Sequence, residues 1–287
     1  MIGGRYEGPD ACGGAHPMPP HEGGWTIDHI RRLWRKLRPP AELSSHEARF
    51  LQGRLPYLAD LAPADQQQLQ QLTALFVRHK KFEGAGGMLV DQAVRLTIAG
   101  QACLLHLRLP GPLFPTLRTV IVYPGTYQVD ETIRRPEGVE LAIQEARAGE
   151  SWSHGTLVLS WEDVLDGFAD PADGWNVVFH EFAHQLDSET GETNGAPALA
   201  HPEDYATWQH HFRAGFELAR QRIRRGEDAY PFDEYDTESP AEYFAAASEL
   251  FFELPAELKV AEPAIYRQLV HFYRQDPAAR RSGRATV

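Results

Sequence analysis

Cysteine is scarce in this chain of 287 residues, with only two in the whole sequence. Cys12 lies in a terminus rich in glycine and proline, and Cys103 lies in an apolar run, so we expect no disulfide framework and a location in the reducing cytoplasm. The N-terminus also lacks the basic start and apolar centre of a secretory signal. No stretch approaches the roughly 20 continuous apolar residues of a membrane span, so we expect no integral membrane protein.

Positive charge is also in deficit. The chain carries 28 lysines and arginines against 40 aspartates and glutamates, a formal net charge of −12. Such a field repels phosphate backbones and gives nucleic-acid binding no electrostatic support. The composition is otherwise that of a soluble globular protein, with 43% hydrophobic and 24% charged residues, and the length is sufficient for a sizeable core.

The composition predicts four segments along the chain. Residues 1–24 are too rich in glycine and proline for regular structure, and we predict that they are disordered. Residues 25–40 predict a basic amphipathic helix, which can dock on its own domain or on an anionic surface. No linker divides the rest, so we predict one domain over 41–277, followed by a flexible tail at 278–287.

Helical and strand patterns alternate irregularly within this domain. Apolar residues at helical spacing predict helices over residues 64–82 and 239–254. Residues 117–123 and 155–161 are β-branched runs bounded by glycine and proline, which predicts strands. Residues 94–109 form a continuous apolar run that fits a buried helix and a strand equally well. The mixture predicts an α+β fold.

The stretch GWNVVFHEFAHQLDSE, residues 174–189, places polar groups inside an otherwise apolar helix. His180 and His184 are about one turn apart, so their imidazoles project from the same face and can bind one ion. Two histidines at this spacing are typical of catalytic zinc sites, which take three protein ligands and leave one position open. Glu181 lies beside that position and can act as general base and then as general acid.

The alternative interpretation is that these histidines have a structural role only and bind no metal. An H-E-x-x-H string arises by chance in roughly one sequence in twenty of this composition, so the string alone does not decide. Three titratable groups inside an apolar helix would be costly to desolvate without a metal, which favours the metal site. A non-catalytic zinc site would need a fourth ligand, and His201, Asp204 or His211 could supply it.

The local sequence pattern does not identify the third metal ligand. Glu242 and Glu249 lie seven residues apart on one face of the predicted helix 239–254. Ser239 and Glu242 have the spacing of a capping box, in which case Glu242 only caps the helix and Glu249 binds the metal. Local physical chemistry does not separate these two alternatives.

Six blocks follow one another along the chain: KKFEGAGG, VRLTIAGQACLL, TVIVYPG, WSHGTLVLSWEDV, FHEFAHQLD and SPAEYFAAASELFF. Taken in this order, they resemble the Mlc titration factor A family of bacterial zinc peptidases, and the resemblance covers about residues 50–277. It implies a zincin-like α+β catalytic domain, mainly helical, with a small mixed sheet beside the active-site helix. The catalytic domain of anthrax lethal factor is similar.

The resemblance also implies roles for individual residues. It makes Glu242 the third zinc ligand, beside His180 and His184, and it places Tyr235 where a phenol can donate a hydrogen bond to the oxyanion. Glu249 then becomes a candidate for orienting a ligand histidine, with Asp187 as its competitor.

The implied function is hydrolysis of a peptide substrate by metal-activated water, with aminopeptidase-like activity. Family members also bind the sugar-uptake transcription repressor Mlc, so the alternative is a regulatory binding module with little or no peptidase activity. Zincins commonly bind an extended peptide against a sheet edge, and we expect residues 155–161 to be that edge strand. A strand paired on both sides is the alternative.

Overall fold

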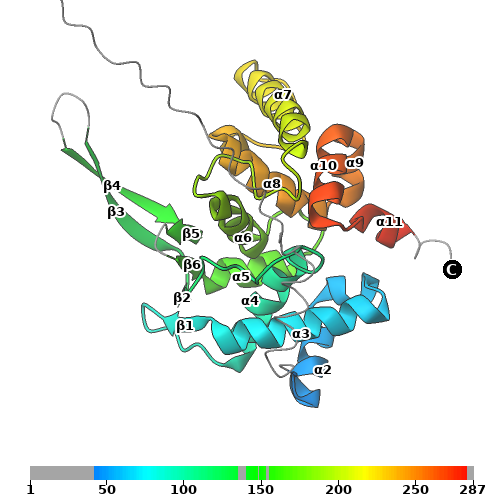
Figure 1. The fold of residues 1–287 in the computed structure, drawn as a ribbon. Coiled ribbons are helices and arrows are strands. Elements are labelled where there is room, and N and C mark those ends of the chain that lie inside the picture. Colours follow the sequence, from blue (N-terminus) through cyan, green and yellow to red (C-terminus); the bar gives the residue numbers. More distant parts are fainter. Residues whose placement is uncertain (1–41, 135–139, 148, 153–154, 283–287) are drawn as a thin grey trace, which may run out of the picture.

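The structure is a computed structural model that describes residues 42–134, 140–147, 149–152 and 155–282 (Figure 1). Most of this part is helical. The helices are α2 (Ser45–Arg54), η1 (Pro56–Asp60), α3 (Pro63–His79), α4 (Gln92–Leu105), α5 (Trp161–Ala169), α6 (Val177–Asp187), η2 (Ser188–Thr190), α7 (Asp204–Arg224), η3 (Tyr235–Thr237), α8 (Pro240–Glu253), α9 (Pro255–Ala261), α10 (Pro263–Tyr273) and α11 (Pro277–Ser282). The strands are β1 (Lys81–Gly84), β2 (Thr119–Tyr123), β3 (Tyr127–Arg134), β4 (Glu140–Arg147), β5 (Gly149–Trp152) and β6 (Thr156–Ser160).

Four strands form the main sheet, in the order β1-β2-β6-β5. The pairs β1–β2 and β2–β6 are parallel, and β5 pairs with β6 in the antiparallel direction, so the sheet is small and mixed as predicted. Strands β3 and β4 form a separate antiparallel hairpin, which projects from the body beside the sheet (Figure 1).

The expectation that residues 155–161 form an edge strand is wrong. β6 pairs with β2 on one side and with β5 on the other, so the alternative of a strand paired on both sides is confirmed. Its burial explains the sequence pattern, because Leu157, Val158 and Leu159 are all buried. A strand covered on both faces carries a continuous apolar run and does not alternate. The outer strand beside it is β5.

The ambiguous run at 94–109 is a helix over most of its length. α4 begins after Asp91, whose side chain accepts a hydrogen bond from the backbone N–H of Val94 at 2.9 Å. The apolar run shows no helical period because α4 is buried on nearly every side, including Gly100 and Gln101. A helix that is hydrophobic all round belongs to the core, and α4 packs against α2, α3 and α6.

Two helices, α6 and α8, pack against each other at the centre of the fold (Figure 1). Asn176 caps the start of α6, where its side chain accepts a hydrogen bond from the N–H of Phe179 at 3.0 Å. Ser239 caps α8 in the same way, and Pro240 occupies the first helical position, where its missing N–H has no cost. α6 also contacts α4, α5, β5 and β6, so the sheet lies on one side of it and α8 on another.

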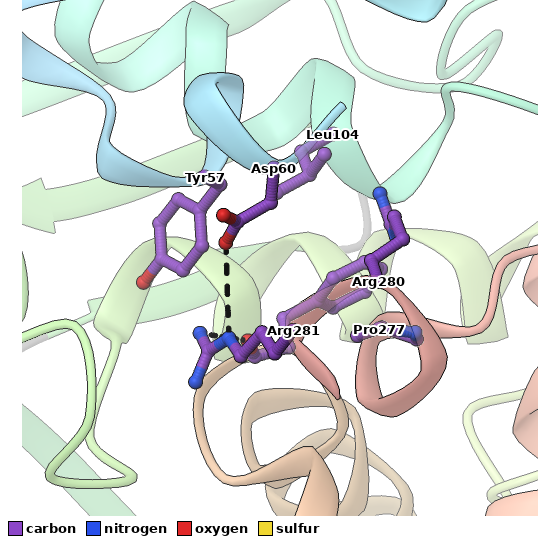
Figure 2. A pocket seen from close by; sticks show the side chains of 7 residues that line it. Tyr57, Asp60, Leu104, Pro277, Arg280 and Arg281 are labelled. Atoms are coloured by element: carbon purple, nitrogen blue, oxygen red, sulfur yellow. Dashed lines mark hydrogen bonds and ion pairs between the residues drawn. The ribbon is translucent and has the colours of Figure 1, made fainter. Parts of the chain in front are cut away.

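The C-terminal helix α11 is anchored to the end of α8. The guanidinium of Arg281 donates to the carbonyls of Glu253 at 2.6 Å and of Phe252 at 3.0 Å. Its Nε also lies 4.0 Å from Oδ2 of Asp60, and both residues line the small pocket shown in Figure 2. Residues 277–282 are helical, so regular structure extends to residue 282, within the segment 278–287 that the sequence predicted to be a flexible tail.

The predicted disordered segment 1–24, the whole of the predicted basic helix 25–40 and residues 283–287 lie outside the described residues. Among the residues that the structure does describe, no helix is both long enough and apolar enough to cross a membrane.

Candidate metal centre

His180 and His184 lie one turn apart on α6 with their rings directed to the same place. Their Nε2 atoms are 3.2 Å apart, and their ring centroids are separated by 4.8 Å. Both side chains are largely buried, because Phe179 and Phe182 on the neighbouring faces of α6 pack into the core. The helix therefore presents two imidazole nitrogens to one point, as the spacing predicted.

Glu242 completes the cluster from α8. Its Oε2 lies 2.9 Å from Nε2 of His180 and 3.3 Å from Nε2 of His184. The backbone N–H of Glu242 donates to the Oγ of Ser239 at 3.2 Å, so the serine caps α8 while the glutamate side chain faces the histidines. Glu242, rather than Glu249, is thus the carboxylate that lies between the two Nε2 atoms.

The three groups are arranged as ligands of a single ion would be. Their nearest ligand atoms all lie within 4.8 Å of one another, and they form the one such cluster found among the described residues. Neighbouring ligands of a tetrahedral ion with bonds of about 2.0 to 2.1 Å are roughly 3.3 Å apart. The separations in the structure are 2.9, 3.2 and 3.3 Å, close to that value. The donor set therefore fits a metal ion, and His201, Asp204 and His211 are outside this cluster.

The pKa values of the residues in this cluster depend on one another. Burial opposes the charged form of His180, but the carboxylates of Glu249 and Glu242 raise the pKa of this histidine well above its ordinary value. Burial would raise the pKa of Glu242, yet its contacts with the two histidines lower that pKa. The carboxylates around His180 therefore favour a positive charge at this site.

Glu249 and Asp187 have different positions. Glu249 reaches the other ring nitrogen of His180, with its Oε1 2.6 Å from Nδ1. Asp187 instead accepts a hydrogen bond through Oδ2 from the N–H of Gly195 at 2.7 Å, and so fastens the following loop to the end of α6. The other oxygen of Asp187 and Nδ1 of His184 are both buried without a hydrogen-bond partner in the described structure.

Glu181 is buried next to the cluster, with 6% of its surface exposed. Its Oε2 has no hydrogen-bond partner among the described residues. Burial raises the pKa of this carboxyl, while the neighbouring His180 and His184 lower it. An unpartnered buried carboxyl beside two histidines is a costly arrangement that a purely structural site does not need.

Tyr235 approaches the cluster from η3. Its ring centroid is 6.2 Å from that of His180, and half of its surface is exposed. The turn that carries it is held by two reciprocal hydrogen bonds: the N–H of Asp233 donates to Asp236, and the N–H of Asp236 donates to Asp233, at 2.8 and 3.1 Å. The structure thus places Tyr235 beside His180.

Two residues of this region were missed by the sequence reasoning. Asn176 and Glu253 lie behind Glu249 in a buried network of hydrogen bonds. Asparagine just before a helical run is an N-cap signal and could have been recognised. Glu253 carries no such signal, because its partners are far away in the sequence.

Comparisons with family models and with individual proteins agree on one family. The family described as glucose-regulated metallo-peptidase M90 matches residues 30–274. An uncharacterized protein of Synechocystis sp. is 36% identical over 257 residues, which cover 88% of this chain and 90% of that protein. Proteins called Mlc titration factor A from Yersinia pestis and Yersinia pseudotuberculosis are each 32% identical over 255 residues, covering 88% of this chain and 92% of theirs. This chain belongs to the glucose-regulated metallo-peptidase M90 family.

Proposed function

We propose that this protein is a zinc-dependent peptidase with a zincin-like fold, in which His180, His184 and Glu242 hold the metal. The observation that carries the proposal is the triangle of ligand atoms from two separate helices, with separations that suit tetrahedral zinc. Two imidazoles and one carboxylate are a common ligand set of catalytic zinc, and such sites keep one position open. Family membership supports the same assignment.

Glu181 is the proposed general base and then general acid. It follows a ligand histidine directly on α6 and is buried with one oxygen unpartnered. Zinc held by these three ligands would supply a Lewis acid that polarises a peptide carbonyl and lowers the pKa of a water molecule. The carboxylate of Glu181 would accept a proton from the attacking water and donate it to the leaving amine.

Tyr235 and Glu249 complete the proposed machinery. The phenol of Tyr235, beside His180, donates a hydrogen bond to the oxygen that becomes negative when the carbonyl is attacked. Glu249 accepts from Nδ1 of His180 and keeps Nε2 directed to the metal.

The proposed substrate is a peptide, cleaved with aminopeptidase-like specificity in the cytoplasm. An extended peptide can add to the side of β5 that faces away from β6, because β5 ends the main sheet among the described strands and contacts α6. Strand β5 thus takes the place of β6 as the proposed peptide-binding strand, because β6 is paired on both sides.

A second candidate function is binding of a transcription repressor. The relatives from Yersinia carry the name Mlc titration factor A, and the alignment with them spans most of both chains. A surface that binds a repressor of the Mlc type can coexist with the metal site, or it can be the main function with peptidase activity secondary.

The test combines elemental analysis with turnover. We expect one zinc per chain and chelator-sensitive hydrolysis of at least one member of a panel of aminoacyl and peptide substrates. Glu181→Gln should keep the zinc and lose hydrolysis by about 100-fold or more, since general acid–base catalysis contributes at least that much. Near wild-type hydrolysis by this variant would show that Glu181 is not the general base.

A pull-down with an Mlc-type repressor separates the two candidates. Binding that survives both Glu181→Gln and removal of the metal, with no substrate cleaved by the wild type, would establish the binding module in place of the enzyme.

A further inference from the structure

The carboxylate of Glu249 joins His180 to the start of α6. Its Oε1 lies 2.6 Å from Nδ1 of His180, and its Oε2 accepts a hydrogen bond from the backbone N–H of Asn176 at 2.7 Å. Both oxygens are therefore used, and the plane of the carboxylate is fixed by these two partners. The direction of the His180 ring consequently depends on the position of the Asn176 backbone.

The side chain of Asn176 fixes that backbone in the core. The residue is 2% exposed. Its Oδ1 accepts from the N–H of Phe179 at 3.0 Å and caps α6. Its Nδ2 donates to Oε1 of Gln101 at 2.8 Å, to Oε1 of Glu253 at 2.9 Å and to the carbonyl of Gly167 at 3.3 Å. The amide thus ties α6 to α4, α5 and α8 at one point.

Glu253 is the most heavily bonded of these partners. Besides Asn176, its Oε1 accepts from the hydroxyl of Tyr57 at 2.6 Å, and its Oε2 accepts from the N–H of Gly174 at 3.3 Å. Its carbonyl is held by Arg281, and Tyr57 and Arg281 both line the pocket of Figure 2. Glu253 is fully buried, and a buried polar network with satisfied members is rigid.

We propose that Asn176, anchored by Glu253, is a positioning residue that sets the orientation of His180 through Glu249 and thereby the affinity of the metal site. This inference rests on the proposed function, in which His180 is a zinc ligand. Asn176 does not contact the metal position itself. It acts through a series of hydrogen bonds that runs Glu253–Asn176–Glu249–His180. The two glutamates belong to α8, and the other two residues belong to the start and the middle of α6.

Asn176 performs two tasks: its Oδ1 caps α6, and its Nδ2 donates to Glu253. Among asparagine, serine and aspartate, only asparagine performs both. Serine provides an oxygen for the N–H of Phe179, but it has no donor that reaches Glu253. Aspartate caps the helix equally well, but its second oxygen is an acceptor and cannot donate to Glu253 as the Asn176 amide does. A helix cap without further duty would accept serine or aspartate with little change.

The test measures the dissociation constant of Zn²⁺ by competition with a chelator and the visible spectrum of the Co²⁺-loaded protein. Asn176→Ser should raise the zinc dissociation constant about tenfold and shift the Co²⁺ bands, because groups behind a metal ligand affect affinity on the order of 10-fold to 100-fold. The matched control is Asp91→Ser, which changes the N-cap of α4 in the same way but has no bond to Glu249. It should leave both measurements as in the wild type.

A second pair of variants keeps the test valid if Asn176→Ser does not fold. Glu253→Met removes the acceptor of the Asn176 amide at similar volume, and it should raise the zinc dissociation constant several-fold, on the order expected for outer groups of a metal site. Glu253→Gln restores a carbonyl oxygen and should bind zinc as the wild type does. Circular dichroism establishes which of these variants are folded.

The outcomes separate this inference from the proposed function. If the wild type binds zinc tightly and every folded variant keeps its affinity and its Co²⁺ spectrum, the positioning role is overturned and the zinc site stands. If the wild type binds no zinc, the proposed function fails, and the inference fails with it.

Discussion

The carboxylate of Glu242 lies 2.9 Å from Nε2 of His180, although 62 positions of the chain separate the two residues. The contact exists because α8 and α6 pack side by side, with the first turn of α8 beside the middle of α6. Each helix is capped by a polar residue just before its first turn, so the positions of both side chains are fixed by rigid elements.

Replacing Glu242 should therefore abolish tight metal binding. We expect Glu242→Gln to weaken zinc binding by more than about 100-fold, since even groups behind the ligands change affinity by 10-fold to 100-fold. The amide has nearly the same shape but no charge, so the fold should persist. Zinc affinity by chelator competition measures the effect, and the exposed Glu238→Gln on the preceding turn is the matched control. Unchanged affinity would exclude Glu242 as a ligand.

The sequence predicted the parts of this site that are local. His180, Glu181 and His184 follow from a spacing of four on one helix, and the capping serine of α8 follows from its position before Pro240. The choice between Glu242 and Glu249 required two helices to be placed together, and no local pattern contains that information. The resemblance to a family supplied it in advance, and the contact with both histidines agrees.

Other features were out of reach for the same reason. The network through Asn176 and Glu253 joins residues 77 positions apart. The edge position of β5, rather than β6, depends on strand order, which a continuous apolar run does not reveal. The helix α4 was ambiguous because it is buried on nearly every side, so its sequence carries no period.

Metal binding should release a proton near neutral pH. The carboxylates of Glu249 and Glu242 raise the pKa of His180 well above its usual value, against the effect of burial, so the metal-free chain holds a proton there. Zinc binds only the neutral ring, and about one proton should leave per ion bound at pH 7. Apparent affinity should accordingly rise as the pH rises.

Titration calorimetry in two buffers with different ionisation enthalpies measures this release. Glu249→Gln removes one of the charges that raise the pKa of His180, so this variant should release a smaller fraction of a proton. Binding heats that are identical in both buffers would contradict the expectation.

The hydroxyl of Tyr235 should matter for turnover and not for metal affinity. Tyr235→Phe removes a donor beside His180, and loss of one such donor lowers kcat by about 100-fold. Since the ring is retained, zinc binding should stay unchanged. The measurements are kcat on the best substrate of the panel and zinc affinity. Tyr230→Phe, at another half-exposed tyrosine of the same loop, serves as the control and should keep full activity.

The stability of the metal-free protein should decrease as the pH rises towards 8, in part because of Glu253. Burial raises the pKa of this carboxyl to about 8 from an ordinary value of 4.5, while hydrogen bonds from Tyr57 and Asn176 act in the opposite direction. Between these two values the folded chain holds a proton that the unfolded chain has released. The contribution of this group is therefore fully present below about pH 4.5 and is lost as the pH rises to about 8.

Glu253→Gln should remove this loss, because the amide resembles the protonated acid and does not titrate. The stability of the variant relative to the wild type should therefore increase between pH 5.5 and pH 8, by about 1 kcal/mol or more. Asp236, whose pKa burial raises to about 7, contributes with the same sign in both proteins and cancels in the difference. Urea unfolding of the chelated proteins between pH 5.5 and 8 measures that difference. Parallel stability curves would show that Glu253 already carries its charge in the folded protein at neutral pH.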